Sequence, residues 1–394
     1  MTASPNHFFV LAPNFFGFKG GVQVYSALVL QGIQKVYPDA RYSVFLKYER
    51  STSDAVSDFS FLPQTRFFAF GERVCDTNGW RRRFRTLLSA ATILVNALIY
   101  RPALIVTTEI NYYVVLCHKL YQRLGIPYWV VLHGIEAWDI KNTAYQKALQ
   151  GADRVIAVSK YTRDRVLAEG YLNPDQMCVL PNTFDPARFK LQPKPTYLLD
   201  RHNLKPEQPI ILTVTRLQGF AHYKGYDKIL RMLPKIRQQV PDVHYVLVGK
   251  GDDRPRIEAM IAELNLQDCV TLTGFVPDEE LPDYYSLCDV FAMPSKGEGF
   301  GIVYLEALAS GRLVLAGNQD GSVDPLLNGK LGCLVDPDDE AAIAAKLIEI
   351  LQGTYANQNL YNPEWLRQEV CKHFEISRFN ANLEGICQKF FFEN

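Results

Sequence analysis

The sequence lacks an excess of charge of either sign. Its 42 basic and 42 acidic residues balance over 394 residues, so the formal net charge is zero. Proteins that bind nucleic acid usually present a strong positive field, which this composition does not supply. Nucleic acid is therefore not an expected partner, and any electrostatic effect has to come from local clusters of charge.

Paired metal-ligand motifs are also missing. The eight cysteines are scattered, with no Cys-x-x-Cys and no histidine at a matching interval, which argues against structural zinc. The acidic pairs Asp252-Asp253 and Asp338-Asp339 are interpreted as loop acids rather than as ligands that hold a metal against a diphosphate. We expect no metal and no cofactor, and we expect most cysteines to be buried thiols in a reducing compartment.

The chain has no long apolar run. Residues 1–6 are polar and have no basic leader before an apolar segment, so a secretory signal is not expected. The longest uncharged stretch, residues 86–100, is shorter than the ~20 residues that span a bilayer. We predict a cytoplasmic protein in which residues 86–100 form a core helix or an interfacial helix.

Short apolar runs alternate with helical patterns, and this order predicts an α/β fold with parallel strands. An aperiodic, proline-containing stretch at 181–205 divides the runs into two groups and is predicted to be a linker. Two doubly wound domains are therefore expected, which also fits the length. The predicted strands are 8–12, 42–46, 103–107, 128–132 and 154–158, then 209–214, 244–248, 270–273, 290–293 and 313–316.

The segment 296–306 carries the strongest indication of a site. It reads Lys-Gly-Glu-Gly-Phe-Gly-Ile-Val-Tyr-Leu-Glu, between a predicted strand and an apolar helix that ends at Gly311. Glycines let the backbone approach a ligand, and the first N–H groups of a helix suit a diphosphate. Glu298 and Glu306 are at most about 12 Å apart, which suits the hydroxyls of an extended nucleotide-sugar better than a glycosidase pair at roughly 5–9.5 Å. The alternative is a surface helix with two solvated glutamates.

Two cations follow the predicted strand 209–214. Arg216 comes directly after it and Lys224 eight residues later, so a guanidinium and an ammonium could neutralise a leaving diphosphate there. The alternative is a pair of solvated loop cations.

Two further candidates follow strands of the first half. Gly20 and Gly21 lie in the turn after the first strand, where a phosphate can bind, although the spacing is not the Gly-x-Gly-x-x-Gly of nicotinamide enzymes. His133 follows the strand 128–132. Their alternatives are a structural tight turn and a satisfied core histidine.

With these residues the chain resembles the retaining GT-B glycosyltransferases of family 4, the glycosyl transferases group 1, of the bacterial polysaccharide type. Their C-terminal domain carries two glutamates separated by seven residues, as Glu298 and Glu306 are. The resemblance implies two Rossmann-like domains facing a deep cleft, 1–185 on the acceptor side and 186–375 on the donor side. It also implies that the terminal helix, 376–394, crosses back to the first domain.

The resemblance assigns a role to each candidate. Glu298 and His133 would face the donor sugar, Glu306 would bind the ribose, and Arg216 and Lys224 would hold the phosphates. The insertion 218–223 makes the interval between these cations longer than in the family. Asp324 lies where relatives have a glutamate. Backbone groups would contact the diphosphate from Gly20, Gly21, Phe300, Gly301 and Ile302, and would line the base pocket at Gly249, Phe275 and Val276.

The implied activity is transfer of a hexose from a nucleoside-diphosphate sugar to a saccharide or lipid-linked saccharide in polysaccharide biosynthesis. UDP-glucose is the expected donor, with GDP-mannose and other UDP-hexoses left open. The nucleotide-sugar is a substrate, and a metal-independent reaction is expected. Alternatives are an epimerase or a phosphorylase on the same fold, and a catalytically weak binding subunit of a polysaccharide assembly complex.

A basic and aromatic cluster precedes the uncharged stretch 86–100. Arg81, Arg82 and Arg83 lie between Trp80 and Phe84, and Arg85 follows Phe84. The cluster suggests contact with anionic lipid, and thus a peripheral position on the inner face of the plasma membrane. The alternative is a solvated turn before a core helix.

Overall fold

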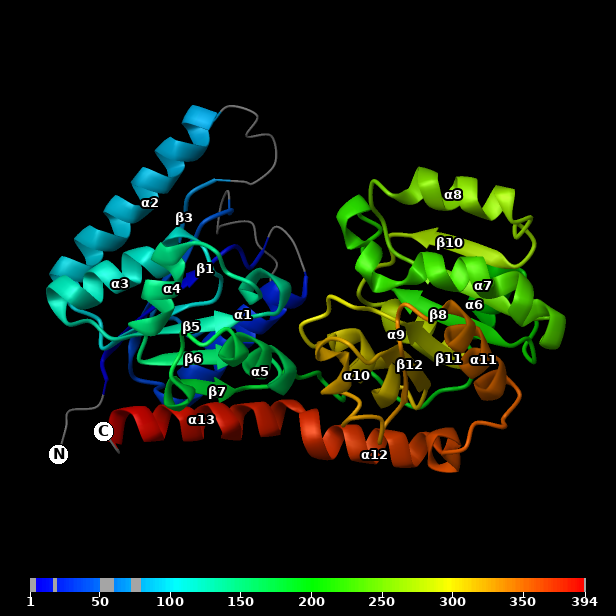
Figure 1. The fold of residues 1–394 in the computed structure, drawn as a ribbon. Helices are drawn as coiled ribbons and strands as arrows, with labels where there is room; N and C mark the ends of the chain where they lie inside the picture. Colours follow the sequence, from blue (N-terminus) through cyan, green and yellow to red (C-terminus); the bar gives the residue numbers. More distant parts are fainter. Residues whose placement is uncertain (1–4, 17–19, 50–59, 72–78, 393–394) are drawn as a thin grey trace. The chain divides into compact units, whose positions relative to one another are not determined.

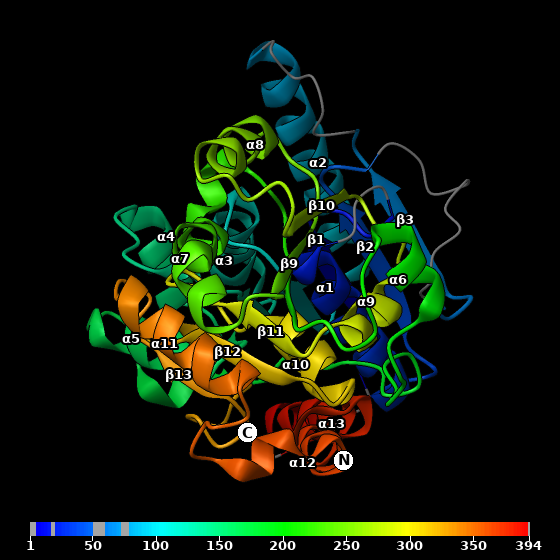
Figure 2. The same cartoon turned by 90° about the vertical axis from the view of Figure 1, so that its right-hand side faces the viewer.

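The computed structural model describes residues 5–16, 20–49, 60–71 and 79–392. The chain forms two compact units, Met1–Asn182 with Ser377–Asn394, and Thr183–Ile376. Each unit contains one parallel β-sheet with helices on both faces (Figures 1 and 2). The predicted α/β architecture of two doubly wound domains is confirmed.

The sheet of the first unit has the order β3-β2-β1-β4-β5-β6-β7, and all its pairs are parallel. The strand order turns between the neighbours β1 and β4, and ligands bind at such a point in open α/β sheets. The strands are β1 (His7–Ala12), β2 (Arg41–Leu46), β3 (Thr65–Ala69), β4 (Leu104–Thr107), β5 (Tyr128–Leu132), β6 (Arg154–Ala157) and β7 (Met177–Val179).

Every residue of β1 is buried because both faces of the sheet are covered. On one face Phe9 belongs to a core that includes Ile93 of α2 and Tyr113 of α3. On the other, Phe8 stacks on Tyr37 and meets Phe391 of α13 edge-on. The helices of this unit are α1 (Gly21–Val36), α2 (Gly79–Tyr100), α3 (Tyr112–Leu124), α4 (Thr143–Gln150), α5 (Lys160–Ala168) and α13 (Ile376–Phe392), with 3₁₀ turns η1 (Ile135–Ala137) and η2 (Pro174–Gln176).

The sheet of the second unit has the order β10-β9-β8-β11-β12-β13 and is also parallel throughout. Its order turns between β8 and β11. The strands are β8 (Ile210–Val214), β9 (His244–Val248), β10 (Val270–Gly274), β11 (Val290–Met293), β12 (Leu313–Gly317) and β13 (Cys333–Val335).

Helices cover both faces of this sheet as well. Figure 2 shows α7 and α11 on one side of it and α9 and α10 on the other. The helices are α6 (Thr196–His202), α7 (Tyr226–Gln239), α8 (Arg254–Glu263), α9 (Leu281–Leu287), α10 (Ile302–Ala309), α11 (Glu340–Leu351) and α12 (Pro363–Phe374), with 3₁₀ turns η3 (Gly219–Lys224), η4 (Gly321–Val323) and η5 (Gln358–Tyr361).

Three edge strands and one helix were not predicted. The strands β3, β7 and β13 each end a sheet, and β7 and β13 have only three residues, so they lack the continuous apolar run of a central strand. The predicted linker 181–205 contains α6, whose Leu198 and Leu199 are buried. Two apolar residues among prolines and charges give no helical period, and only packing within the second unit reveals the helix.

Helix α13 should contribute strongly to the stability of the first unit. Leu383 is fully buried and lies against Gly32 of α1, so close that a Cβ at Gly32 would be 2.5 Å from its Cδ2. Leu383→Ala should lower the free energy of unfolding of this unit by about 2–5 kcal/mol because it leaves a cavity. Urea denaturation of the full chain measures the loss. The exposed neighbour Asn382→Ala serves as control, and an equal effect of both variants would contradict the assignment.

Candidate functional site

The loops after β8 and β11 bring most of the predicted donor residues to one edge of the second sheet. These strands are neighbours, and the sheet order turns between them. After β8 the chain passes through the exposed Arg216 and then through η3, whose last residue is Lys224. After β11 it passes through Glu298 and enters α10. The carboxyl ends of strands at such a point are where open α/β sheets bind ligands.

Lys224 and Glu298 form an ion pair with each other. Both side chains are largely buried, with 15% and 18% of their areas exposed. Burial alone would lower the pKa of Lys224, but the charges of Glu298 and Tyr223 outweigh it and raise the pKa above its ordinary value. Lys224 is therefore a charged ammonium held next to a carboxylate. No pattern in the sequence indicates this contact, because the two residues are 74 positions apart.

Asp320, in the loop after β12, holds the backbone of Glu298 in place. Its fully buried carboxylate accepts hydrogen bonds from the Glu298 N–H at 2.7 Å, the Ser295 hydroxyl at 2.7 Å and the Ser322 N–H at 2.9 Å. Burial raises the pKa of Asp320, and these hydrogen bonds oppose the rise. The Gly321 N–H also donates to the Glu298 carbonyl at 2.8 Å.

From the sequence, Asp324 is compared with a family glutamate, and no role is assigned to Asp320. A buried carboxylate needs several donors, and those of Asp320 come from two loops that are far apart in the sequence. The only local signal was the Asp-Gly-Ser turn itself, in which Asp320 caps η4. Asp324, the residue compared with the family glutamate, is half-buried after η4.

The N-terminus of α10 follows this loop. Gly301 is its N-cap, with φ +88° in the left-handed region, and a Cβ there would lie 2.4 Å from the Tyr304 ring. Glycine is therefore required at this position. Because glycine has no side chain, it cannot cap the first N–H groups of α10. Phe300, the residue before this N-cap, is buried and its ring meets Phe374 edge-on at 5.7 Å, so its side chain anchors the turn.

Glu306 lies in the second turn of α10 and accepts a hydrogen bond from the Tyr285 hydroxyl at 2.6 Å. Burial raises the pKa of Glu306, although the hydrogen bond from Tyr285 and the charge of Arg188 lower it. Tyr285, on α9, was not singled out in the sequence. The second glutamate is thus oriented by a buried tyrosine rather than solvated.

The loops after β9 and β10 meet beside the loop after β8. The Gly249 N–H donates to the Gly274 carbonyl at 2.9 Å, and a Cβ on Gly249 would be 1.7 Å from the Thr215 carbonyl oxygen. Phe275 follows directly and is 64% exposed, with the Lys250 ammonium 4.8 Å from its ring centroid. Val276 is half-buried. An exposed aromatic ring in this position offers a surface for stacking.

Three predicted residues belong to the first unit. Gly20 is the N-cap of α1 and Gly21 its first residue, directly after the loop that follows β1. His133 follows β5, and its Nε2 is 2.8 Å from the Thr108 carbonyl oxygen, beyond β4. Its ring meets the Tyr25 ring edge-on at 5.3 Å. All three therefore lie at the carboxyl-end edge of the first sheet, as predicted from their places after strands.

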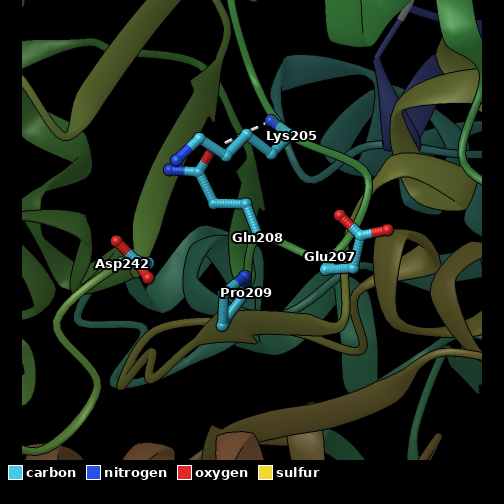
Figure 3. A pocket seen from close by; sticks show the side chains of 5 residues that line it. All are labelled: Lys205, Glu207, Gln208, Pro209 and Asp242. Atoms are coloured by element: carbon cyan, nitrogen blue, oxygen red, sulfur yellow. Dashed lines mark hydrogen bonds between the residues drawn. The ribbon is translucent and has the colours of Figure 1, made fainter.

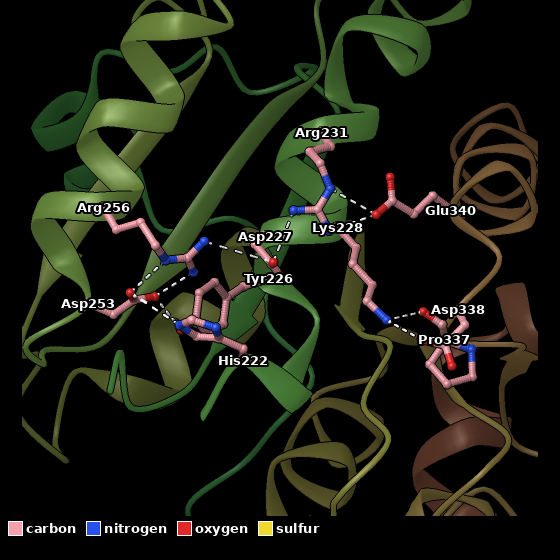
Figure 4. Close-up of polar contacts among 10 residues, drawn as sticks. All are labelled: His222, Tyr226, Asp227, Lys228, Arg231, Asp253, Arg256, Pro337, Asp338 and Glu340. Carbon is pink, nitrogen blue, oxygen red and sulfur yellow. Dashed lines mark hydrogen bonds and ion pairs between the residues drawn. The ribbon is translucent and has the colours of Figure 1, made fainter. Parts of the chain in front are cut away.

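The insertion 218–223 forms most of η3, and Figure 4 shows how its end is anchored. His222 lies 3.4 Å from the Asp253 carboxylate, which also accepts hydrogen bonds from Arg256 at 2.6 and 2.7 Å and from the Tyr226 hydroxyl at 2.7 Å. These contacts join η3 to the start of both α7 and α8. The longer interval between Arg216 and Lys224 is thus an ordered element that ends at Lys224.

The acidic pair Asp338-Asp339 has structural roles. Asp338 binds Lys228 at 3.1 Å and Lys296 at 2.7 Å, and Asp339 caps α11 through the Ala342 N–H. Within the described ranges, no three side chains of His, Cys, Asp or Glu gather where they could hold a metal ion. Metal independence itself stays a prediction.

A small pocket lies at the opposite edge of the second sheet (Figure 3). Lys205, Glu207, Gln208, Pro209 and Asp242 line it, at the beginnings of β8 and β9. These are the amino ends of the strands, away from Lys224 and Glu298. The pocket contains none of the predicted site residues.

Family models match both parts of the chain. The model described as "Glycosyl transferases group 1" matches residues 198–362, which include both glutamates and Lys224, and "Glycosyltransferase Family 4" matches residues 55–188. The chain belongs to this family of glycosyltransferases.

Among curated members, the GDP-mannose-dependent alpha-(1-6)-phosphatidylinositol monomannoside mannosyltransferase of Mycolicibacterium smegmatis is 35% identical over 231 residues. The match covers 56% of this glycosyltransferase chain and 59% of that relative. The chain therefore matches less than two thirds of the relative's length.

Solved structures share the fold over nearly the whole chain. Anabaena Alr3699/HepE in complex with UDP-glucose has a TM-score of 0.74 at 21% identity, covering 97% of this chain and 99% of that one. The sucrose-phosphate synthase of Thermosynechococcus elongatus has a TM-score of 0.77 at 20% identity, covering 99% and 100%. The predicted GT-B fold class of this glycosyltransferase is confirmed.

The contacts of Asp253 predict an acid-sensitive contribution to stability. The hydrogen bonds from Arg256 and Tyr226 outweigh burial and lower the pKa of Asp253 from 3.8 to about 2. The contribution is thus present above pH 3.8 and is lost as the pH falls towards 2. Asp253→Asn should lower the free energy of unfolding by about 1–2 kcal/mol at pH 7 and by less at pH 3. Urea titrations at both values measure it.

Asp268→Asn is the matched control, because Asp268 forms an exposed pair with Arg237 at 2.7 Å. Exposed pairs contribute little, so its effect should be small at both pH values. A loss for Asp253→Asn that is the same at pH 7 and pH 3 would show that charge is not its cause.

Proposed function

We propose that this glycosyltransferase moves a hexose from a nucleoside-diphosphate sugar to a hydroxyl of a saccharide or lipid-linked saccharide, in the biosynthesis of an exopolysaccharide or a related glycoconjugate. The observation that carries the proposal is the paired Lys224 and Glu298 beside the N-terminus of α10. One edge of the sheet thus offers a cation and helix N–H groups to a diphosphate, and a carboxylate to sugar hydroxyls.

Each group then has a distinct task in donor binding. Lys224 and Arg216 neutralise the diphosphate, together with backbone N–H groups of residues 300–302. Glu298 accepts hydrogen bonds from the hexose, and Glu306, oriented by Tyr285, accepts them from the ribose. The backbone at Gly249 and Val276 lines the base pocket, and the exposed Phe275 ring stacks on the base. Gly20, Gly21 and His133 of the first unit stay candidates, because the family resemblance alone assigns them to the pyrophosphate and the sugar.

The reaction we propose retains the anomeric configuration. The bond from the sugar C1 to the diphosphate oxygen breaks, and a bond from C1 to the acceptor oxygen forms on the same face. The acceptor proton passes to the departing phosphate. Lys224 and Arg216 stabilise the negative charge that develops on the diphosphate, which is commonly the largest contribution to such a rate.

UDP-glucose is the donor we propose, supported by the fold shared with a protein solved in complex with UDP-glucose. GDP-mannose is the second candidate, because the mannosyltransferase with 35% identity is named as GDP-mannose-dependent. An assay of hydrolysis or transfer of labelled donor by the purified chain would also distinguish the two alternatives. Turnover indicates a transferase, and no turnover indicates a binding subunit of an assembly complex.

We also propose that the protein is cytoplasmic and peripheral on the inner face of the plasma membrane. None of the helices in the described ranges is both long and apolar enough to cross a bilayer. The proposed attachment rests on helix α2.

Loss of the Glu298 charge should weaken binding of the nucleotide-sugar but not of the free nucleotide. In Glu298→Gln the affinity for UDP-glucose should fall about 10- to 100-fold, because a charged acceptor is worth on the order of 1.5–3 kcal/mol. Affinity for UDP should persist or rise, since Lys224 loses its competing partner. Calorimetry with both ligands tests this, and GDP with GDP-mannose tests the second donor.

Glu306→Gln is the matched variant for the ribose and should weaken UDP and UDP-glucose alike. Equal losses of both ligands in Glu298→Gln would remove the assignment of Glu298 to the hexose.

Transfer should not need a divalent cation. Because Lys224, Arg216 and the helix N–H groups neutralise the diphosphate, turnover of labelled donor should persist in excess EDTA. If chelation abolished turnover and Mg²⁺ restored it, the task given to the two cations would be wrong.

A further inference from the structure

Helix α2 presents its apolar side chains outward. In a helix of a soluble protein the apolar stripe usually faces the core and the polar face meets water. In α2 the outer face carries Leu87 and Ile99, which are 69% and 66% exposed, and Trp80, which is 65% exposed. The other large exposed side chains of this helix are Phe84, Leu88, Leu94, Val95, Leu98 and Tyr100.

The inner face of α2 is fixed by specific contacts. Arg85 is buried with its guanidinium 5.3 Å from the Tyr48 ring centroid, and the Ser89 hydroxyl bonds to the Tyr112 hydroxyl. Further along, Ile93 and Ala97 join the core of the first unit. These four residues follow one another at intervals of four, so they all lie on the inner side of the helix. The helix is thus held in one rotation, with the apolar stripe outside.

Apart from Tyr100, whose ring meets His7 edge-on at 5.4 Å, the exposed residues of α2 form a patch rather than a normal scatter. Of the fourteen large apolar side chains found exposed in the described ranges, nine belong to this helix. Single exposed apolar residues are ordinary on soluble proteins, whereas a contiguous group marks a surface that binds something.

We infer that the outer face of α2 docks on an anionic lipid bilayer and lies in its interface. The helix contains four arginines and no acidic residue, and Arg81 and Arg83 are exposed at its beginning. Anionic headgroups complement this charge, while the apolar face and Trp80 enter the boundary of the acyl chains. A second copy of α2 would bring no acidic residue to these arginines.

The structure corrects the membrane patch expected from the sequence in two respects. The arginines, expected to adjoin the apolar helix, are part of α2 itself, which begins at Gly79, so the alternative of a solvated turn before the helix is wrong. Arg85 belongs to the inner face, because its stacking on Tyr48 buries it, so it is not available to lipid. The apolar stripe, more than the arginines, defines the surface.

The inference goes beyond the proposed transfer reaction and is independent of it. Sedimentation with vesicles of phosphatidylglycerol and phosphatidylcholine tests it, with phosphatidylcholine alone as the neutral probe. The parent protein should bind the anionic vesicles and be released by high salt. Leu87→Gln with Leu94→Gln and Leu98→Gln should reduce binding at least tenfold, because glutamine keeps the helix but removes the apolar face.

A second variant and a control test whether the arginine charges contribute to binding and whether each variant is folded. Arg81→Ser with Arg83→Ser should weaken binding to anionic vesicles, whereas Lys119→Ser with Arg123→Ser, two exposed cations on α3, should not. Nucleotide calorimetry and thermal unfolding of each variant should match the parent, which shows that it is folded.

Two results would overturn the inference. One is a triple glutamine variant that sediments as the parent does. The other is light scattering that shows the parent to be a dimer in the absence of lipid and the triple variant a monomer, because the face would then bind a second copy. If neither the parent nor any variant bound a donor, the transferase proposal would be rejected, whereas the inference about lipid would not be affected.

Discussion

The buried carboxylate of Asp320 is the constraint on which the candidate site depends. A carboxylate with no exposure is stable only where several donors reach it, and its donors lie in the loops after β11 and β12. It thereby fixes the backbone of Glu298, whose side chain in turn holds Lys224 from the loop after β8. One buried charge therefore relates three loops at neighbouring strands. The glycines of this edge serve the same end, since they let these loops come within backbone contact.

The sequence predicts the parts of the fold that bury continuous apolar runs. Central strands such as β5 and β9 are entirely buried, so their composition alone identifies them. Edge strands and α6 have too few apolar residues for that. In the candidate site, Glu298 and Glu306 could be proposed because they bracket a glycine turn, and Arg216 because it closely follows a strand. Asp320 and Tyr285 could not, because their partners lie elsewhere in the sequence and only the folded chain shows the hydrogen bonds.

Helix α2 shows a different limit. Periodicity reveals that a helix has two unlike faces, but the rule that the apolar face is the inner one is an assumption about its surroundings. Here Arg85 and Ser89 find partners inside the first unit, and the leucines are left outside. Burying a polar side chain costs little free energy when the side chain has a stacking or hydrogen-bonding partner. The contacts with Tyr48 and Tyr112, together with the burial of Ile93 and Ala97, hold this face of the helix inside.

The ion pair of Lys224 and Glu298 has a consequence for turnover in the proposed reaction. A diphosphate that binds Lys224 takes it from Glu298, so each binding event exchanges one anion for another rather than gaining a new contact. The hexose offsets that loss by occupying Glu298, but the nucleoside diphosphate left after transfer has no such group. Glu298 then competes for Lys224 against the spent nucleotide. The same pair that selects the intact donor would thus favour release of the product and limit product inhibition.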